Sequence, residues 1–419
     1  MKYLILLLIL SVYINADCII FKDESKLYCK IVGQNKEKYR VQVSKLYIDI
    51  FKIYVKETNS DSESFSLSQE KEEGLKPLLE ELVKTSPNSK KAKKLRADIT
   101  EIGVGVWSHI QHLISKEPPV LTPEHVLEML KKWKRIETLP ILVSYIESTE
   151  PPIYSKAIDI LTTFENLASV PIFISFLLKD TIPVPLQKAL LKLGKKKGLN
   201  VSDITLNYAK EIKNWQKKHH NFFLFLGKLG TPEIIGFFQA QLQMEQRIHQ
   251  IIMTSIAALG QTKKRESVEI ISRWLNDQDP IVVKEAILSL GINENENAVP
   301  ILIELLKNED FQHSEEAYWT LEKISGKKIL KDVWAWENWW KKRENYRENL
   351  NVVYDDLNSS SEETIIIGLQ KISALSSKET LNVVVELLKH SSPQIRSAAC
   401  QSLMKFGTIA FQAVPQLIE

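Results

Sequence analysis

Tryptophan forms the clearest chemical pattern in this 419-residue sequence. Trp336, Trp339, Trp340 and Arg343 have the spacing i, i+3, i+4 and i+7, which places them on one face of a helix. That face is either a recognition platform for a peptide, a glycan or a stacked base, or a surface that folds back and covers the protein's edge with its indoles. The pattern favours the second interpretation. Trp334 falls outside this face and is therefore the better candidate for an exposed contact.

The three cysteines allow one disulfide. Cys18 and Cys29 flank the hairpin-like stretch CIIFKDESKLYC. A turn centred on Asp23 and Glu24 would place them directly opposite each other, within reach of a cross-strand bridge. A bridge and two free thiols both fit this pattern. Cys400 occupies a small-residue position in the sequence AAC, and we expect it to be an inert core thiol.

Histidine and carboxylate patterns indicate neither a metal centre nor a catalytic site. Only the pairs His109 with His112 and His219 with His220 suggest metal binding, and a zinc site needs three or four ligands in tetrahedral geometry. Nucleophile elbows, phosphate-binding loops and paired-acid motifs are missing from the sequence. We therefore expect no enzyme activity, no cofactor and no metal.

The first sixteen residues, MKYLILLLILSVYINA, are typical of a secretory signal peptide that is cleaved after Ala16. A membrane anchor or a buried first helix is the alternative, but the apolar run is shorter than the ~20 residues that a span needs. We expect an exported protein of the periplasm or cell envelope, or an extracellular one, with no membrane span after cleavage. The formal net charge of +3 argues against nucleic acid as an obligatory partner.

The remaining sequence divides into four parts. Residues 17–56 are rich in β-branched and aromatic residues and predict a small β-barrel-like module. Residues 57–71 are polar and predict a flexible linker. Residues 72–121 predict lead-in helices that cap the first repeat, and 122–419 form a repeat region.

The repeat region carries an apolar anchor about every thirty residues, usually with a small residue four positions earlier. A unit of two helical patterns cannot bury its apolar face alone, so neighbouring units must stack into an α-solenoid. Segments 195–215 and 326–345 interrupt the period as inserts. The anchors are Leu130, Leu161, Leu193, Leu229, Leu259, Leu290, Leu321, Ile372 and Leu403, and prolines that suit the start of second helices are Pro140, Pro171, Pro232, Pro300 and Pro415.

Residues 393–419, PQIRSAACQSLMKFGTIAFQAVPQLIE, resemble a HEAT repeat of the phycobilisome-lyase type, with Ile395, Arg396 and Leu403 in expected positions. Residues 279–306 resemble it nearly as well. This resemblance implies a mainly α protein, a right-handed α-solenoid of helical pairs. The first strands resemble the SH3-like or Sm-like modules that open many exported bacterial repeat proteins.

The resemblance specifies a fold and says little about function. We expect a non-catalytic scaffold or adaptor that binds a protein or peptide along the concave surface of the second helices. One alternative is an anionic-polymer binder that uses lysine clusters at 90–96, 195–197, 263–265 and 341–343. The other is a lyase-like enzyme, which an apolar pocket or a reactive cysteine would support.

Overall fold

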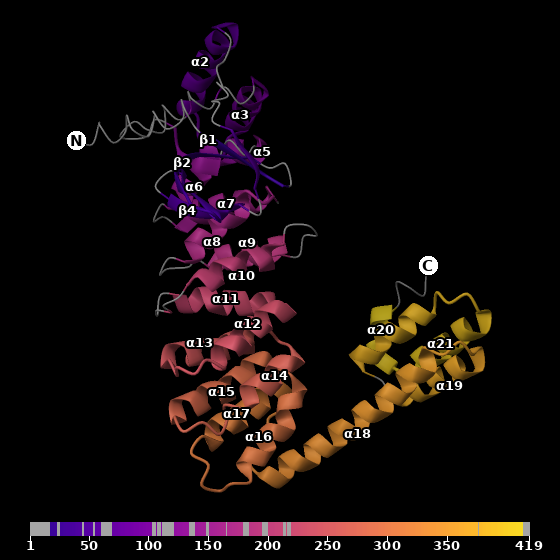
Figure 1. The fold of residues 1–419 in the computed structure, drawn as a ribbon. Coiled ribbons are helices and arrows are strands. Elements are labelled where there is room, and N and C mark those ends of the chain that lie inside the picture. The colour runs from indigo at the N-terminus through magenta and orange to yellow at the C-terminus, as the bar shows by residue number, and fades with distance from the viewer. Residues whose placement is uncertain are drawn as a thin grey trace. The chain divides into compact units, whose positions relative to one another are not determined.

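The computed structural model describes residues 17–22, 26–43, 46–52, 55–59, 69–102, 106, 110, 121–133, 139–147, 151–164, 166–178, 184–194, 200–212, 215, 219–375 and 377–413. The chain forms two compact units, Met1–Asn293 and Glu294–Glu419. Strands occur at the N-terminus and helices follow (Figure 1). The predicted fold class, a mainly α solenoid with a small β-rich domain, is confirmed. The expected signal peptide lies outside the described residues.

An antiparallel sheet forms the β module. In space its strands follow the order β4-β3-β2-β1-β5. Register shifts between Ile20 and Phe21 and between Ile31 and Gly33 mark bulges, which bend a strand and increase its twist. The strands are β1 (Asp17–Phe21), β2 (Lys26–Gln34), β3 (Lys38–Val43), β4 (Leu46–Phe51) and β5 (Val55–Asn59). Alternate side chains, including Ile19, Leu27, Val41, Ile48 and Ile50, are buried in its core.

The predicted linker at 57–71 is too long. Residues 57–59 belong to β5 and pair with β1, and α2 already begins at Gln69. The sequence ETN at 57–59 looks like linker because β5 is an edge strand with little apolar content. The rest of the expected linker, 60–68, lies outside the described residues.

The lead-in helices form a hairpin that contacts the first repeat. They are α2 (Gln69–Val83) and α3 (Lys90–Ile102), and α3 packs on α5 (Pro123–Trp133). His125 of α5 is 1% exposed and joins these elements. Its Nδ1 accepts a hydrogen bond from Arg96 Nη1 at 3.0 Å, and its Nε2–H donates to the Thr85 carbonyl at 3.1 Å. One neutral ring therefore links α5 to the end of α2 and to α3.

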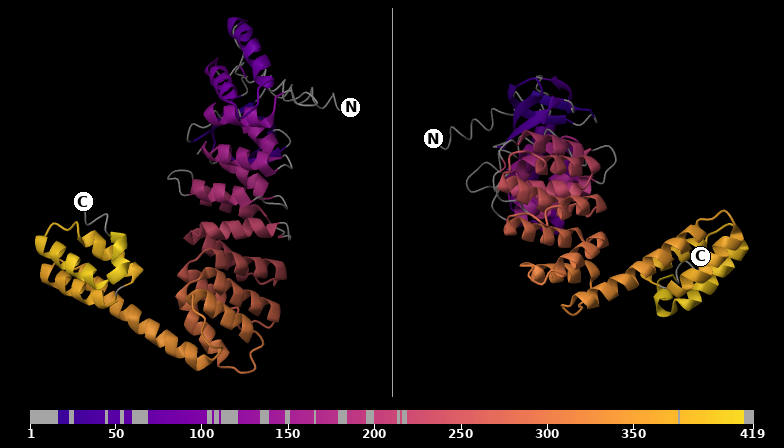
Figure 2. Two further views of the ribbon diagram at one scale, coloured as in Figure 1. Left: turned by 180° about the vertical axis from the view of Figure 1, so that it is seen from behind. Right: turned by 60° about the horizontal axis from the view of Figure 1, so that its bottom comes forward.

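The repeats of the N-terminal unit are helical pairs whose first helices stack on one another, α5 on α7, α7 on α9, and so on to α15 (Figure 2). The first helices are α5, α7 (Pro151–Thr162), α9 (Val184–Gly194), α11 (His220–Leu229), α13 (His249–Gln261) and α15 (Pro280–Asn293). The second helices are α6 (Leu139–Ile146), α8 (Ser169–Leu177), α12 (Pro232–Leu242) and α14 (Arg265–Ser272). Pro140, Pro171 and Pro232 lie in their first turns, as expected.

One anchor residue differs from the expectation. Leu226, not Leu229, is fully buried in α11. A glycine, Gly227, comes directly after Leu226, and Gly260 likewise comes directly after the anchor Leu259. These glycines allow neighbouring helices to touch, because a Cβ on Gly227 would lie 2.1 Å from the Ala258 carbonyl oxygen. The recurring element is thus a Leu-Gly pair at a helix crossing.

Polar contacts link the loops of successive repeats. Arg247, which precedes α13, binds both carboxylate oxygens of Asp277, which precedes α15, at 2.8 and 2.9 Å. The Asp277 side chain is 6% exposed. Burial alone would raise the pKa of Asp277, but Arg247 and the backbone N–H of Asp279 outweigh it and hold that pKa below its usual value.

The β module packs on the second helices of the first repeats. β4 contacts α8 and β2 contacts α6. The first insert supplies α10 (Val201–Glu211), which packs against α8, α9 and α11. Trp215, just beyond it, is buried and stacks on Phe223 with ring centroids 3.7 Å apart. The insert is therefore an integral layer of the N-terminal unit.

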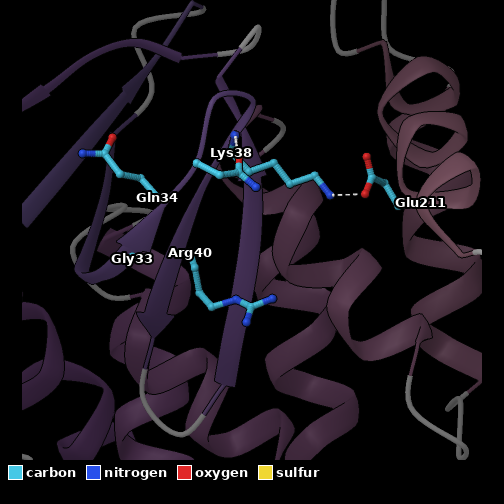
Figure 3. A pocket seen from close by; sticks show the side chains of 6 residues that line it. Gly33, Gln34, Lys38, Arg40 and Glu211 are labelled. Atoms are coloured by element: carbon cyan, nitrogen blue, oxygen red, sulfur yellow. Dashed lines mark hydrogen bonds and ion pairs between the residues drawn. The ribbon is translucent and has the colours of Figure 1, made fainter.

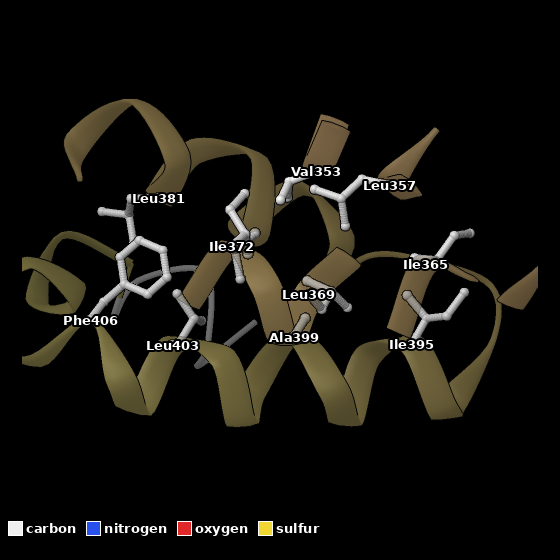
Figure 4. Close-up of a cluster of buried hydrophobic side chains, with 11 residues drawn as sticks. Val353, Leu357, Ile365, Leu369, Ile372, Leu381, Ile395, Ala399, Leu403 and Phe406 are labelled. Atoms are coloured by element: carbon white, nitrogen blue, oxygen red, sulfur yellow. The ribbon is translucent and has the colours of Figure 1, made fainter. Parts of the chain in front are cut away.

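In the C-terminal unit a 25-residue helix, α18, joins two groups of helices. It contacts α16 and packs on α19, and Val353 and Leu357 near its end enter a core with Leu369, Ile372 and Leu403 (Figure 4). The second insert continues without a break past 345 as part of this helix. The elements are η5 (Glu296–Ala298), α16 (Val299–Leu306), α17 (Ser314–Ser325), α18 (Val333–Leu357), α19 (Glu362–Ile372), η6 (Ser373–Leu375), α20 (Lys378–Leu387), α21 (Pro393–Lys405) and η7 (Gly407–Ala413).

Candidate functional site

The tryptophans of α18 have different environments. Trp336 is completely buried, and Trp339 and Trp340 are half-buried. The Trp336 and Trp339 ring centroids lie 5.7 Å apart in an edge-to-face arrangement, and Trp339 and Trp340 lie 6.2 Å apart. Trp334 is 72% exposed. The indoles of the predicted helix face therefore contribute to packing, and Trp334 is the one among these four that is mostly exposed.

Ion pairs hold this part of α18 against the preceding helices. Arg343 Nη2 lies 2.9 Å from Glu296 Oε1, and Arg347 lies 3.8 Å from the other oxygen of the same carboxylate. Lys307, at the end of α16, pairs with Glu337 at 3.2 Å. Arg343, the fourth member of the predicted face, thus pairs with a carboxylate of the same chain.

Large exposed apolar side chains occur on α17, on the connection that follows it and on the first turn of α18. Trp319 is 50% exposed, Leu330 is 79% exposed, and with Trp334 they form what we call the Trp334 surface. Lys331 pairs with Glu315 of α17. The pKa of Tyr318 is raised by burial and by the nearby carboxylates of Asp332 and Glu315. These contacts place the start of α18 beside α17.

Cations border the Trp334 surface. Lys323 Nζ lies 5.1 Å above the Trp319 ring, a cation–π contact. Lys327, Lys328 and Lys331 lie in the exposed connection that carries Leu330. Asp332 caps α18, since its carboxylate accepts a hydrogen bond from the Ala335 N–H at 2.8 Å. The surface therefore combines protruding apolar groups with donors at its rim.

The lysine clusters contain residues that already bind carboxylates or carbonyls. In the cluster at 90–96, Lys91 pairs with Glu81 at 2.5 Å and Arg96 donates to the Pro87 carbonyl at 2.8 Å. In 263–265, Arg265 lies 4.0 Å from Glu269. The cluster at 341–343 includes Arg343, and 195–197 lies outside the described residues.

Cys18 and Cys29 do not stand directly opposite each other. The β1–β2 register pairs Asp17 with Cys29 and Cys18 with Tyr28, one residue away from the expected pairing of Cys18 with Cys29. Cys29 is buried, and the side chain of Cys18 lies outside the described residues. The disulfide therefore stays a prediction, without the direct pairing that motivated it.

Cys400 is exposed, so its assignment as a core thiol is wrong. Ala399 and Leu403 face the core, and Cys400 is one residue further around α21. It lines an apolar pocket of about 490 Å³ together with Leu403, Met404 and Phe411. Met404 and Phe411 are 76% and 73% exposed, respectively.

A second pocket, of about 410 Å³, lies between the β module and α10, and its lining is polar (Figure 3). Lys38 extends from β3 to Glu211 at the end of α10, with 2.9 Å between Nζ and Oε2. Arg40 lies beside it on the same strand, and Gly33, Gln34 and Asn35 complete the described lining. No sequence pattern indicates this pocket, because its two sides come from distant parts of the chain. We call it the β2–β3 pocket.

Within the part of the chain that the structure describes, no group of three or more His, Cys, Asp or Glu is placed to hold a metal ion. His220 Nδ1 is hydrogen-bonded to Thr254 Oγ1 at 3.2 Å, and burial lowers the pKa of His220. His109 and His112 lie outside the described residues. Over the same described part, none of the helices combines the length and the apolar character needed to cross a bilayer.

Comparison with protein families finds HEAT repeats at residues 249–322 and a further HEAT repeat at 381–410. The predicted resemblance to HEAT repeats is confirmed at that level. No relative was found among curated proteins. The first match spans α13 to α17 in sequence, and the second covers α20 and α21.

Solved structures that are similar to the chain include two engineered proteins and human deoxyhypusine hydroxylase in complex with glycerol. The engineered proteins are 15% and 14% identical, each over 79% of this chain and 99% and 97% of their own, with TM-scores of 0.24 and 0.13. The hydroxylase is 12% identical over 80% of this chain and 96% of its own, with a TM-score of 0.23. At these scores the similarities carry no argument about function.

Proposed function

We propose that this HEAT-repeat chain is a non-catalytic scaffold of the periplasm or cell envelope that binds a protein or peptide partner through the Trp334 surface. The observation that carries the proposal is the exposure of Trp319, Leu330 and Trp334 around one connection. Isolated exposed apolar residues are normal, but large ones that gather at one place mark interaction sites. Repeats of this kind present extended surfaces suited to such binding.

The energetics favour a protein partner. Full burial of a large apolar side chain contributes about 1.5–3 kcal/mol, and tryptophan is enriched among the few residues that dominate binding energy. Trp334 and Leu330 start from 72% and 79% exposure, so a partner can bury most of their surface. Lysines at the rim favour a partner with acidic residues around an apolar centre.

Export is part of the proposal and rests on the first sixteen residues. The N-terminal sequence of the protein isolated from its source organism tests it. Mature protein that begins near Asp17 in an envelope fraction is the expected result, whereas full-length protein with Met1 intact in the cytosol would exclude export.

Partner capture tests the binding surface. The immobilised full chain is exposed to envelope extract, and the retained molecules are identified at low and high salt. We expect the unchanged chain to retain one protein in stoichiometric amount, and Trp334→Ser to fail to retain it. Met404→Ser is the matched control, since Met404 is equally exposed elsewhere in the same unit.

Two outcomes would contradict the proposal. If Trp334→Ser retained the partner as well as the unchanged chain does, the Trp334 surface would not be the binding site. Retention of nucleic acid or glycan that is released as salt rises would instead support the anionic-polymer alternative, because phosphate contacts are strongly salt-dependent.

The lyase-like alternative has one observation in its favour, the exposed Cys400 in an apolar pocket. Labelling with a thiol-reactive reagent, followed by peptide mass spectrometry, measures whether that thiol is unusually reactive. A labelling rate equal to that of free cysteine would leave the scaffold as the better description.

For the β module, the strand order β4-β3-β2-β1-β5 with bulges supports the SH3-like or Sm-like assignment.

A further inference from the structure

The β2–β3 pocket brings together the two parts of the N-terminal unit that the repeat pattern does not explain. One wall is the turn between β2 and β3, and the other is the end of the insert helix α10. The Lys38 side chain is only 12% exposed and spans the two walls through its ion pair with Glu211. Because β4 rests on α8, and α8 contacts α10, the walls are held by packing as well as by this pair.

One side-chain amide of this pocket, that of Asn35, is orientated so that it offers donors. Asn35 Oδ1 accepts hydrogen bonds from the backbone N–H groups of Glu37 and Lys38, at 2.9 and 2.7 Å. The Gln34 side chain instead accepts from Lys52 Nζ, at 3.0 Å, on the sheet face that carries Tyr39, and it points away from Lys38 and Arg40 (Figure 3). With Asn35 Oδ1 used inside the protein, what this amide can present to a ligand is its NH₂ group.

The lining of the pocket also carries more positive than negative charge. Lys38 and Arg40 are cations, and among the described lining residues Glu211 alone is an anion. Asp49 stands opposite Arg40 in the β3–β4 register. A guanidinium has five N–H donors and an ammonium has three, so both side chains can bind a ligand oxygen while they keep their contacts within the protein.

From this excess of donors over acceptors we propose that the β2–β3 pocket binds a small ligand through an oxyanion group, a carboxylate or a phosphate. Arg40 provides the planar pair of donors that matches either group, Lys38 adds a second cation, and the Asn35 amide binds a neighbouring ligand oxygen. A pocket of about 410 Å³ suits a ligand of the size of a monosaccharide acid or an amino acid. This site is independent of the Trp334 surface.

Ligand-observed NMR on the full chain tests the proposal. The probes are galacturonate and glutamate for carboxylates and inorganic phosphate for the phosphate group. Galactose serves as the uncharged counterpart of galacturonate. Three variants are compared with the unchanged protein: Arg40→Gln removes the charge, Arg40→Lys keeps the charge but removes the planar donor pair, and Arg273→Gln removes an exposed arginine from α14's end as the control.

We expect saturable binding of at least one oxyanion probe, no binding of galactose, and a loss of about tenfold in affinity in Arg40→Gln with none in Arg273→Gln. The probe that binds identifies carboxylate or phosphate as the preferred group. Lys38→Gln serves as the second variant if circular dichroism shows that Arg40→Gln is less folded. The proposal fails if no oxyanion binds, if galactose binds as well as galacturonate, or if both arginine-to-glutamine variants bind equally.

Discussion

His125 predicts a pH-dependent attachment of the lead-in helices. Burial of its ring lowers the pKa, Arg96 lowers it further, and the Thr85 carbonyl and Glu124 act in the opposite direction with less total effect. The folded protein therefore binds fewer protons at this site than the unfolded chain. The stability that depends on neutral His125 is fully present above about pH 6.5 and is lost as the pH falls through the lowered pKa.

The magnitude comes from two hydrogen bonds. The bond from Arg96 is charge-assisted and contributes about 1.5–3 kcal/mol, and the bond to the Thr85 carbonyl contributes about 0.5–1.5 kcal/mol. His125→Ala removes both and leaves the two partners, Arg96 and Thr85, half-buried without these bonds. We expect the free energy of local opening of α2 and α3 to fall by about 2–4 kcal/mol.

Hydrogen exchange measured by mass spectrometry resolves this local effect, which a global unfolding curve would average over the repeats. Between pH 7.5 and 5.5, after correction for intrinsic rates, protection of α2 and α3 should decrease while that of α19 stays constant. Glu128→Ala, an exposed change on the same helix, is the control. Unchanged protection of α2 and α3 in both the acid series and His125→Ala would refute the reasoning.

Two further predictions concern the stacking of repeats. Gly227→Ala should destabilise the N-terminal unit by about 1–3 kcal/mol or more in chemical denaturation, because the new Cβ would overlap the Ala258 carbonyl; Gly236→Ala, which meets open space, should be neutral or stabilising. Protection of α13 and α15 should be present above about pH 4 and fall in more acidic solution, because Asp277 has a lowered pKa and its protonation breaks the pair with Arg247. Arg247→Gln should lower this protection already at neutral pH and flatten its dependence on acid, because the pKa of Asp277 is then no longer held down. An unchanged acid profile would contradict the role of the pair.

Most of the helical architecture can be predicted from the sequence because burial sets a strong pattern. Anchors such as Leu130, Leu259 and Leu403 are buried where predicted, since a helix that packs on both neighbours must place an apolar residue there. The misplaced anchor in α11 arose in the run FFLFLGKL, where apolar residues at nearly every position hide the 3.6-residue period. Cys400 was misassigned for a related reason: one step along a helix turns the side chain by about 100°.

The β2–β3 pocket and the Trp334 surface differ in how far the sequence reveals them. The helical spacing of the tryptophans separated Trp334 from the face that packs inward. By contrast, the contact between Lys38 and Glu211 depends on how the β module rests on α8, which is a tertiary arrangement without a local signal. The same limit applies to Arg96 and His125, whose pairing joins α3 to α5 over 29 residues of sequence.

The docking of the β module on α6 and α8 also affects competition for the repeats. These second helices are part of the surface on which a solenoid of this kind is expected to bind partners, and here a segment of the same chain already occupies them. A tethered segment acts at an effective concentration on the order of millimolar. A partner for α6 or α8 must therefore either displace an intramolecular competitor or bind the β module and the repeats as one composite surface.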